Sequence, residues 1–237
     1  MKLQEIFDQL TYGELSQYVV GGKGSNGIQF ESYPEIINHI NLGLTALYKR
    51  FVISKKELSI VPQTGLFTYV LHPDYLIGSN SNKPYKYLVA SSEFPFNAEV
   101  LSILQIFDSD QAEIQPNSSR AINPVYFDSP YLVRLPSPNP DNPVTLVYQS
   151  NHPKIILNSM YAQDTEIELP ILFLDCLLFF IGSRVAASNP SINDTNVQDS
   201  AQFMAKYELA CTLIEQKGLL KTEEEIVNGR FEQGGWV

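Results

Sequence analysis

The stretch of residues 36–62, IINHINLGLTALYKRFVISKKELSIVP, changes from a helical to a strand pattern with no glycine or proline at the change. Apolar residues in its first part recur at three- and four-residue steps, which predicts an amphipathic helix: Ile36, Ile37, Ile40, Leu44, Leu47, Tyr48 and Phe51. From Glu57, the residues ELSIVP have the composition of a short strand. We therefore expect a helical region joined to a β-region by a rigid junction over residues 51–57.

Local signals mark both ends of this helix. The tetrapeptide Ser32-Tyr-Pro-Glu35 offers a capping serine, a proline in the first turn and a glutamate three residues on. Lys49 and Arg50 complement the negative end of the helix dipole. Upstream, residues 2–19 predict a short helix that is bent or restarted by a capping box at Thr11-Tyr-Gly-Glu14.

The N-terminal part of the sequence supports neither a phosphate-binding loop nor a signal peptide. The glycine-rich segment 21–27, GGKGSNG, lacks the strand-to-helix context of a phosphate-binding loop. The first ten residues have no basic head followed by a long apolar run, so we expect no signal peptide.

Short β-rich runs separated by turn residues follow from Glu57 to about Ile156: ELSIVP, LFTYVL, YKYLVA, VLSILQIF, AEIQ, YLVRL and VTLVYQS. Asp108-Ser-Asp110 predicts a hairpin turn between two of them. The proline-rich segment 137–143 cannot join a central ladder. Short strands in this number favour a small antiparallel sandwich or barrel-like sheet.

Two helices are predicted next. The most apolar run, residues 169–182, is interrupted by Asp175 and is shorter than the ~20 residues that span a bilayer. We therefore expect residues 169–187 to form a buried helix that is apolar nearly all round. Asp175 within it calls for a partner, either Arg184 or another subunit. From residue 195 or 199 to 216, a second helix carries a stripe of Phe203, Tyr207, Cys211 and Ile214, and Gly218 is its natural stop. Cys176 and Cys211 are expected to be small core residues of a reducing compartment.

The fold class expected is α+β. Residues 1–56 and 165–220 would form a helical bundle, residues 57–164 an inserted antiparallel β-domain, and residues 221–237 an extended C-terminal arm. The arm is polar but contains two aromatics that could anchor it on a partner; the alternative is a disordered end.

The chemistry of the sequence gives no support to an enzyme. Sixteen basic and twenty-six acidic residues give a formal charge of −10, which disfavours binding to nucleic acid phosphates. The three histidines lack metal-ligand spacing, and no nucleophile or phosphate-loop motif occurs, so we expect neither a metal nor a cofactor. Carboxylate groups at 108/110 and 164/166/168 fit turns and a helix start. They also leave open a hydrolase that uses Asp108, Asp110 or Glu166.

Three segments together resemble the tail tubular protein A family, the head-to-tail adaptors of short-tailed bacteriophages. The first is INLGLTALYKRFVISKKELSIVP, residues 40–62, and the second is LPILFLDCLLFFIGSRVAAS, residues 169–188. The third is DSAQFMAKYELACTLIEQKGLL, residues 199–220. The start, Leu10-Thr-Tyr-Gly-Glu-Leu-Ser16, is similar to ring proteins of larger phages of this kind. The β-insertion is longer than in the smallest members of the family.

The resemblance implies a structural protein with no catalytic residues. Members of the family form a ring, usually of twelve subunits, between the portal protein and the downstream tail or nozzle protein. DNA passes through the ring without specific binding, and no membrane is involved. The ring belongs to the virion's neck and assembles in the host cytoplasm. We expect the portal-binding arm to act through Ile226, Arg230, Phe231 and Trp236, and the subunit or bundle interface to contain Asp175, Phe179, Phe180, Arg184 and Tyr207.

Other functions remain open from the sequence. Within the same class, the chain could be a neighbouring ring or tail-completion component of the virion. From a different class, it could be a cell-wall-degrading tail hydrolase, or a binding module of unknown ligand.

Overall fold

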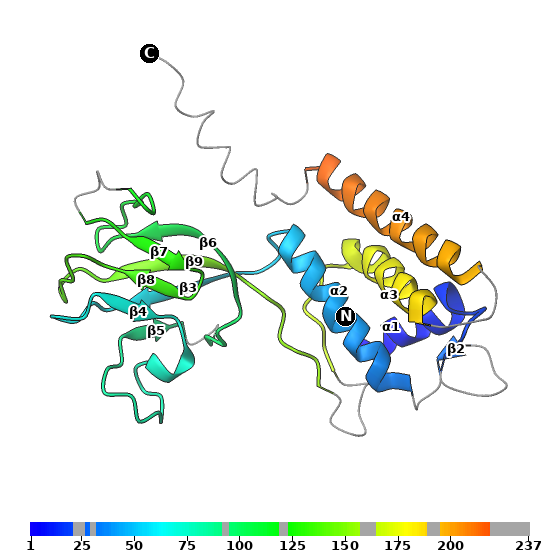
Figure 1. Ribbon diagram of the computed structural model, residues 1–237, viewed down its shortest axis with the longest axis horizontal. Helices are drawn as coiled ribbons and strands as arrows, with labels where there is room; N and C mark the ends of the chain where they lie inside the picture. The colour runs from blue at the N-terminus through cyan, green and yellow to red at the C-terminus, as the bar shows by residue number, and fades with distance from the viewer. Residues whose placement is uncertain are drawn as a thin grey trace, which may run out of the picture. The chain divides into compact units, whose positions relative to one another are not determined.

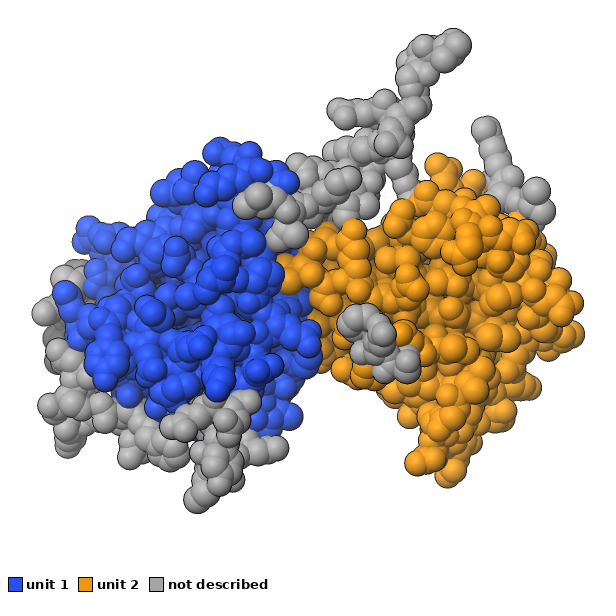
Figure 2. Space-filling view, turned by 180° about the vertical axis from the view of Figure 1, so that it is seen from behind, with its two compact units in different colours: residues 1–51, 152–237 blue, residues 52–151 orange. Residues whose placement is uncertain are grey.

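The computed structural model describes residues 1–20, 27–28, 32–91, 95–118, 123–156, 165–188 and 195–218. Among them it contains four α-helices and two antiparallel sheets, so the predicted α+β class is confirmed (Figure 1). The chain divides into two compact units (Figure 2). Unit 1 comprises residues 1–51 and 152–237, and unit 2 comprises residues 52–151.

The N-terminal helix of unit 1 changes its winding part-way. The α-helix α1 (Leu3–Gln9) passes directly into the π-helical turn η1 (Leu10–Glu14), where Gly13 has non-helical dihedral angles of φ −110° and ψ −106°. The predicted bend is therefore present, but the predicted capping box is wrong, because residues 11–14 continue a helix and do not begin one. Two short parallel strands follow, β1 (Val19–Val20) and β2 (Gly27–Ile28).

The helix predicted from residue 36 is α2 (Tyr33–Arg50), with its proline in the first turn and Lys49 and Arg50 in the last. Ser32 makes no side-chain capping bond, contrary to expectation. Its φ of −93° and ψ of −3° are close to helical, whereas a capping residue is normally extended. The predicted apolar face is buried, and the helix ends at Phe51, whose backbone is extended.

The remaining helices of unit 1 are α3 (Leu174–Ser188) and α4 (Thr195–Gln216). A 3₁₀ turn, η5 (Ile171–Phe173), precedes α3 because Pro170 is extended, so the α-helix starts later than predicted. Gly218 ends α4 as predicted, with a left-handed φ of +59°. Among the described residues, one helical stretch, Ile171–Ser188, is long and apolar enough to cross a bilayer. Most of α3 is buried inside unit 1, as expected from its composition.

Two glycines allow neighbouring helices to approach α3 closely. A Cβ on Gly43 of α2 would lie 2.7 Å from Leu177 Cδ1 and 3.0 Å from Phe180 Cδ1. A Cβ on Gly182 of α3 would lie 3.0 Å from Cδ1 of Phe203 in α4. A Cβ at either crossing would force its neighbours to shift, so α3 is held tightly between α2 and α4 (Figure 1).

Unit 2 consists of two antiparallel sheets. The four-stranded sheet has the order β5-β3-β9-β6, and its strands are β3 (Lys55–Ile60), β5 (Leu88–Ala90), β6 (Val100–Phe107) and β9 (Val144–Ser150). The other has the order β4-β8-β7, and its strands are β4 (Thr68–Val70), β7 (Tyr126–Ser129) and β8 (Leu132–Arg134). A short 3₁₀ turn, η3 (Pro73–Tyr75), follows β4.

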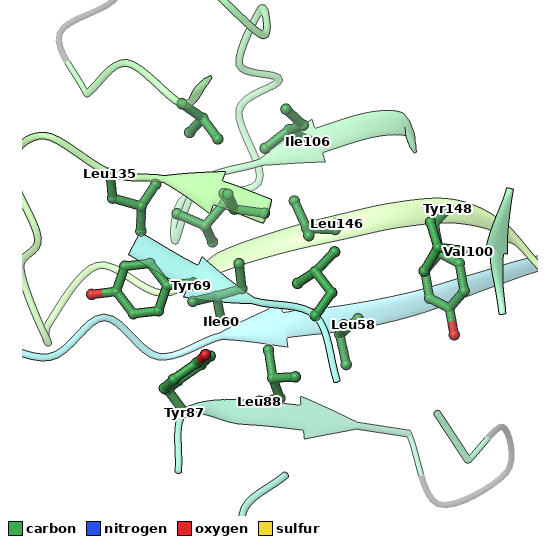
Figure 3. Close-up of a cluster of buried hydrophobic side chains, with 14 of the residues drawn as sticks. Leu58, Ile60, Tyr69, Tyr87, Leu88, Val100, Ile106, Leu135, Leu146 and Tyr148 are labelled. Carbon is green, nitrogen blue, oxygen red and sulfur yellow. The ribbon is translucent and has the colours of Figure 1, made fainter. Parts of the chain in front are cut away.

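The two sheets share one hydrophobic core (Figure 3). The four-stranded sheet contributes Leu58, Ile60 and Leu146, while Tyr69 reaches the same cluster from the other sheet. The rings of Tyr69 and Tyr87 meet edge to face at 4.9 Å. Alternation along the strands therefore places one apolar side of each sheet in a common interior.

The hairpin predicted at residues 108–110 is present but short. Phe107 and Glu113 form an antiparallel bridge, and Asp108 Oδ1 accepts the backbone N–H groups of Asp110 and Ala112 at 2.9 and 2.8 Å. The run AEIQ forms only this bridge and is not a strand. The strand β7 was not predicted, since its residues, YFDS, alternate poorly.

We expect Gly43→Ala to lower the free energy of unfolding of unit 1 by about 1 kcal/mol. Overpacking against Leu177 and Phe180 costs about 1–3 kcal/mol, and the better helix propensity of alanine recovers up to about 1 kcal/mol. Urea unfolding followed by helical circular dichroism would measure the difference. The exposed Asn38→Ala, on the same helix, is the control and should stabilise or change little. Stabilisation by Gly43→Ala would contradict the close crossing.

We also expect unit 2 to lose stability as the pH rises from about 10 to about 12. Burial raises the pKa of Tyr148 from 10.0 to about 12. The unfolded chain therefore releases this proton first, so the contribution is intact below pH 10 and is lost as the pH approaches 12. Tyr148→Phe should reduce the alkaline loss, and Tyr131→Phe at an exposed position should not. Urea unfolding at about pH 8 and about pH 11 tests this, and equal losses in all three proteins would refute it.

Candidate functional site

Helix α4 has two apolar faces, one buried and one exposed. Phe203, Tyr207, Cys211 and Ile214 are buried against the rest of unit 1, as predicted. On the other side, apolar residues recur every four positions at exposed sites, a set that we call the α4 stripe: Ala201, Ala205, Leu209 and Leu213. The sequence analysis missed this stripe, although its four-residue spacing was visible.

The α4 stripe is exposed to an unusual degree for large apolar side chains. Leu209 is 61% exposed and Leu213 is 47% exposed. Single exposed leucines are ordinary, but a row of apolar side chains along one helix is typical of an interaction site. Unit 1 therefore presents α4 as a helix that is packed on one side and available on the other.

Arg50, the last residue of α2, fixes α4 in this position. Its Nε bonds Glu215 Oε1 at 2.7 Å and its Nη1 bonds Glu208 Oε2 at 2.6 Å. The two glutamates are seven residues apart, about two helical turns, so one guanidinium spans them. The hydrogen bond to Glu215 raises the pKa of Arg50 above its ordinary value, and the guanidinium stays charged. The clamp joins elements that are 158 to 165 residues apart in the chain.

Three of the residues predicted at a subunit or bundle interface lie between α3 and α4. The rings of Phe180 and Tyr207 meet edge to face at 5.5 Å, and both residues are buried. Phe179 is half-buried, with the ammonium group of Lys206 lying 5.5 Å from its ring centroid. Phe180 and Tyr207 thus pack within the chain's own helices.

Of the two partners expected for Asp175, Arg184 of the same chain is not one, and a residue of another subunit stays a prediction. Asp175 and Arg184 are both exposed, and no ion pair joins them. They are nine residues apart on one helix, which separates them by about 13 Å along the axis. Asp175 lies in the first turn of α3, where the helix dipole favours a carboxylate. Arg184 lies near one ring, with its Cζ 5.9 Å from the centroid of Phe180.

The two cysteines behave as core residues, as predicted. Cys176 of α3 and Cys211 of α4 are free, fully buried thiols. A hydrogen bond between the thiols, together with burial, raises the pKa of Cys176, so this thiol stays protonated. The pair contributes to the packing of α3 against α4.

The predicted arm residues Ile226, Arg230, Phe231 and Trp236 lie outside the described residues, as does Asp164. Glu166 is exposed and lies in unit 1, where its backbone bridges to Lys2. Asp108 and Asp110 belong to the turn of unit 2, and backbone N–H groups occupy the carboxylate of Asp108. The carboxylate of Asp108 therefore has the turn role expected for it.

Two of the histidines, His72 and His39, lie in different surroundings. His72 caps η3 by accepting the N–H of Asp74, a capping role of the kind expected. His39, on α2, has no hydrogen-bond partner for either ring nitrogen, and burial lowers its pKa. Over the parts of the chain that the structure describes, no group of three or more histidine, cysteine or carboxylate side chains can hold a metal ion.

A polar pin that sequence reasoning missed holds the chain where it returns to unit 1. His152 is buried, its Nε2 lies 3.1 Å from the carbonyl oxygen of Asn41, and its ring meets Tyr48 edge to face at 5.7 Å. The amide of Asn41 donates to Ile155 O at 3.0 Å and accepts from Ile155 N at 2.9 Å. Partners more than 100 residues apart leave no local signal in the sequence.

Neither a scan against protein-family models nor a search of curated proteins found a match. The function must therefore be argued from the chain's own residues.

We expect Arg50→Ala to destabilise unit 1 by about 1–2 kcal/mol, because it removes charge-assisted hydrogen bonds to two carboxylates. Arg50→Lys should restore only part of the loss, since an ammonium group cannot pair with one carboxylate through two donors and also reach a second. Arg184→Ala, which removes an arginine with no ion pair in the described residues, is the matched control and should stay within about 0.5 kcal/mol. Thermal unfolding followed by circular dichroism would rank the three. Equal effects at positions 50 and 184 would contradict the clamp.

Proposed function

We propose that the chain is the head-to-tail adaptor of a short-tailed bacteriophage. In this proposal it is a structural ring protein without catalytic residues, and it joins the portal to the tail and lines the channel through which DNA leaves. It acts in the neck of the virion after assembly in the bacterial cytoplasm, and it uses no cofactor or membrane. A neighbouring ring or tail-completion component is the variant within the same class.

The observation that carries the proposal is the α4 stripe. An exposed apolar row along a helix needs a cover in the working protein, and a second copy of the chain is a cover that is available in equal amount. The helix is also firmly held from behind by Arg50 and by the packing of Phe203 and Tyr207. A rigid apolar face of this kind suits contact between neighbouring subunits of a ring.

The organisation of the chain supports the same proposal. The helices of unit 1 come from both ends of the chain, and the β-unit is inserted between them. In the proposed ring, these helices form a bundle that packs side by side with its neighbours. The inserted β-unit meets the downstream tail or nozzle protein, and residues 221–237 form an extended arm on the portal, anchored by Phe231 and Trp236.

The charge of the chain fits a channel for DNA. Twelve copies at −10 each would carry a charge of about −120. A surface of that sign repels phosphates, so DNA could slide past without adhering. The proposal therefore assigns DNA the role of passing cargo and not that of a bound ligand.

The test is binding to the portal ring of the same phage, measured by light scattering. We expect the full chain to form a ring-sized complex, and a chain that ends at Leu220 to lose it because the arm is missing. Leu209→Asp should also prevent the complex, because it places a carboxylate in the α4 stripe. Lys217→Asp, exposed at the end of the same helix, is the control and should bind normally.

The outcomes separate the possibilities. No complex between an intact portal ring and the full chain would overturn the portal-facing role. A complex that forms equally well with Leu209→Asp would overturn the use of the α4 stripe. Circular dichroism of each variant would confirm that the monomer is folded, as expected for a change at an exposed site.

A further inference from the structure

A cavity of about 280 Å³ opens in unit 1 between η1 and the first half of α4. Its lining includes Glu14, Gln17 and Tyr18 from the N-terminal segment and Asp199, Gln202 and Lys206 from α4. At this size it lies just below the ~300 Å³ of the smallest drug-sized pockets, so it suits one long side chain. We call it the η1–α4 pocket.

Two carboxylates give this pocket its character. Asp199 Oδ2 accepts the hydroxyl of Tyr18 at 2.8 Å. Burial, and then this hydrogen bond, raise the pKa of Tyr18 to about 12, so its hydroxyl remains a donor and carries no charge. Glu14 and Asp199 are both half-buried, and neither forms an ion pair with any residue that the structure describes. Half-buried carboxylates of this kind favour a cationic partner.

The one basic residue of the lining does not supply that partner. The ammonium group of Lys206 lies 5.3 Å from the ring centroid of Phe203 and 5.5 Å from that of Phe179. These contacts hold the charge over aromatic faces, and Lys206 forms no ion pair within the described part of the chain. The η1–α4 pocket thus keeps a net negative charge.

A cation without an acidic partner lies elsewhere on the same unit. The described arginines are Arg50, Arg134 and Arg184, and the first two bond carboxylates. Arg184 is exposed and has no such partner among the described residues. It is near α2, since the Phe180 ring beside it packs against Gly43 of that helix. Leu42, one turn after His39 on that helix, is 48% exposed.

We propose that Arg184 of one copy inserts its guanidinium into the η1–α4 pocket of the next copy, between Glu14 and Asp199. The inference rests on the proposed ring and names the contact that joins its subunits. Gly182 of α3 faces Phe203 of α4, and Arg184, two residues on, lies about 200° round the helix from that contact, so it faces away from the side of α4 that forms the pocket with η1. Such a contact is head-to-tail, and it leaves one pocket and one arginine available at each end until a ring closes.

The α4 stripe and the pocket can be covered by the same neighbour. Gln202 and Lys206, which line the pocket, lie on α4 among the stripe residues, and the incoming side offers Leu42 beside Arg184. Apolar contact along the helix would supply adhesion, and the bidentate guanidinium–carboxylate contact would set the register between copies. Lysine is a poorer occupant, because it lacks the planar fork that can bond two carboxylates.

The experiment traps the contact covalently in the full chain. Gln17→Cys places a thiol at the pocket, and Ala187→Cys places one on the exposed last turn of α3, three residues after Arg184. The two variants, carrying tags of different size, are mixed at high concentration with a short bis-maleimide. We expect a cross-linked heterodimer at roughly ten times the yield of a control mixture of Gln17→Cys and Lys49→Cys. The unaltered chain shows the background from Cys176 and Cys211, which are fully buried.

Charge reversal gives the second arm of the test. Arg184→Glu in the Ala187→Cys partner should reduce the yield to that of the control. Glu14→Lys in the Gln17→Cys partner should do the same, and the two reversals together should restore it. Arg184→Lys in the Ala187→Cys partner should give a lower cross-linking yield than the native arginine gives. Circular dichroism checks that each variant is folded. If Arg184→Glu is not folded, Arg184→Gln takes its place, and if Glu14→Lys is not folded, Glu14→Gln takes its place.

Each result has a consequence. A yield no higher than the control, or one that ignores charge reversal, overturns the Arg184 contact. If the portal still binds the full chain, the adaptor function survives that result. Cross-linking that follows the charges without any binding to the portal supports the contact between copies and overturns the adaptor function alone.

Discussion

Helix α3 is apolar on nearly all sides, and the rest of unit 1 covers it. Helices α2 and α4 approach it through Gly43 and Gly182, and η1 packs on it as well. Only positions such as Asp175 and Arg184, near its two ends, reach solvent. Because burying this one helix consumes the apolar faces of its neighbours, any further apolar surface on them is surplus to the fold of the monomer.

That surplus leaves unit 1 with an exposed apolar surface. Helix α4 buries Phe203 and Tyr207 in the core, and it also has leucines on its exposed side. Arg50 ties α4 to the end of α2, so the free side is held in place by more than apolar packing. The η1–α4 pocket adds negative charge next to this surface, and Arg184 adds positive charge beside α2. Adhesion and charge are thus both placed on the helical unit.

Sequence patterns predicted the features that depend on near neighbours in the chain. The extent of α2, the buried stripe of α4 and the stop at Gly218 follow from periodicity and local backbone preference, and all three are confirmed. The pairing of Asp175 with Arg184 was wrong because helical rise separates residues nine positions apart. The Arg50 clamp, the pin at His152 and the η1–α4 pocket could not be predicted, since each joins residues that only the fold brings together. The α4 stripe was missed because a helix with two apolar faces looks like a buried one until its packing is known.

The polar pin at the return to unit 1 has a consequence for how such a chain can change. The side-chain amide of Asn41 donates to the carbonyl oxygen of Ile155 and accepts from its N–H. His152 packs against Tyr48, in the last turn of α2. Within unit 2, Ser150 N bonds Ser54 O at 3.1 Å, so the two ends of the β-unit are also side by side there. An insertion whose entrance and exit are fastened together behaves as a cassette. It can lengthen, shrink or be exchanged during evolution while the helical unit keeps its own surfaces intact.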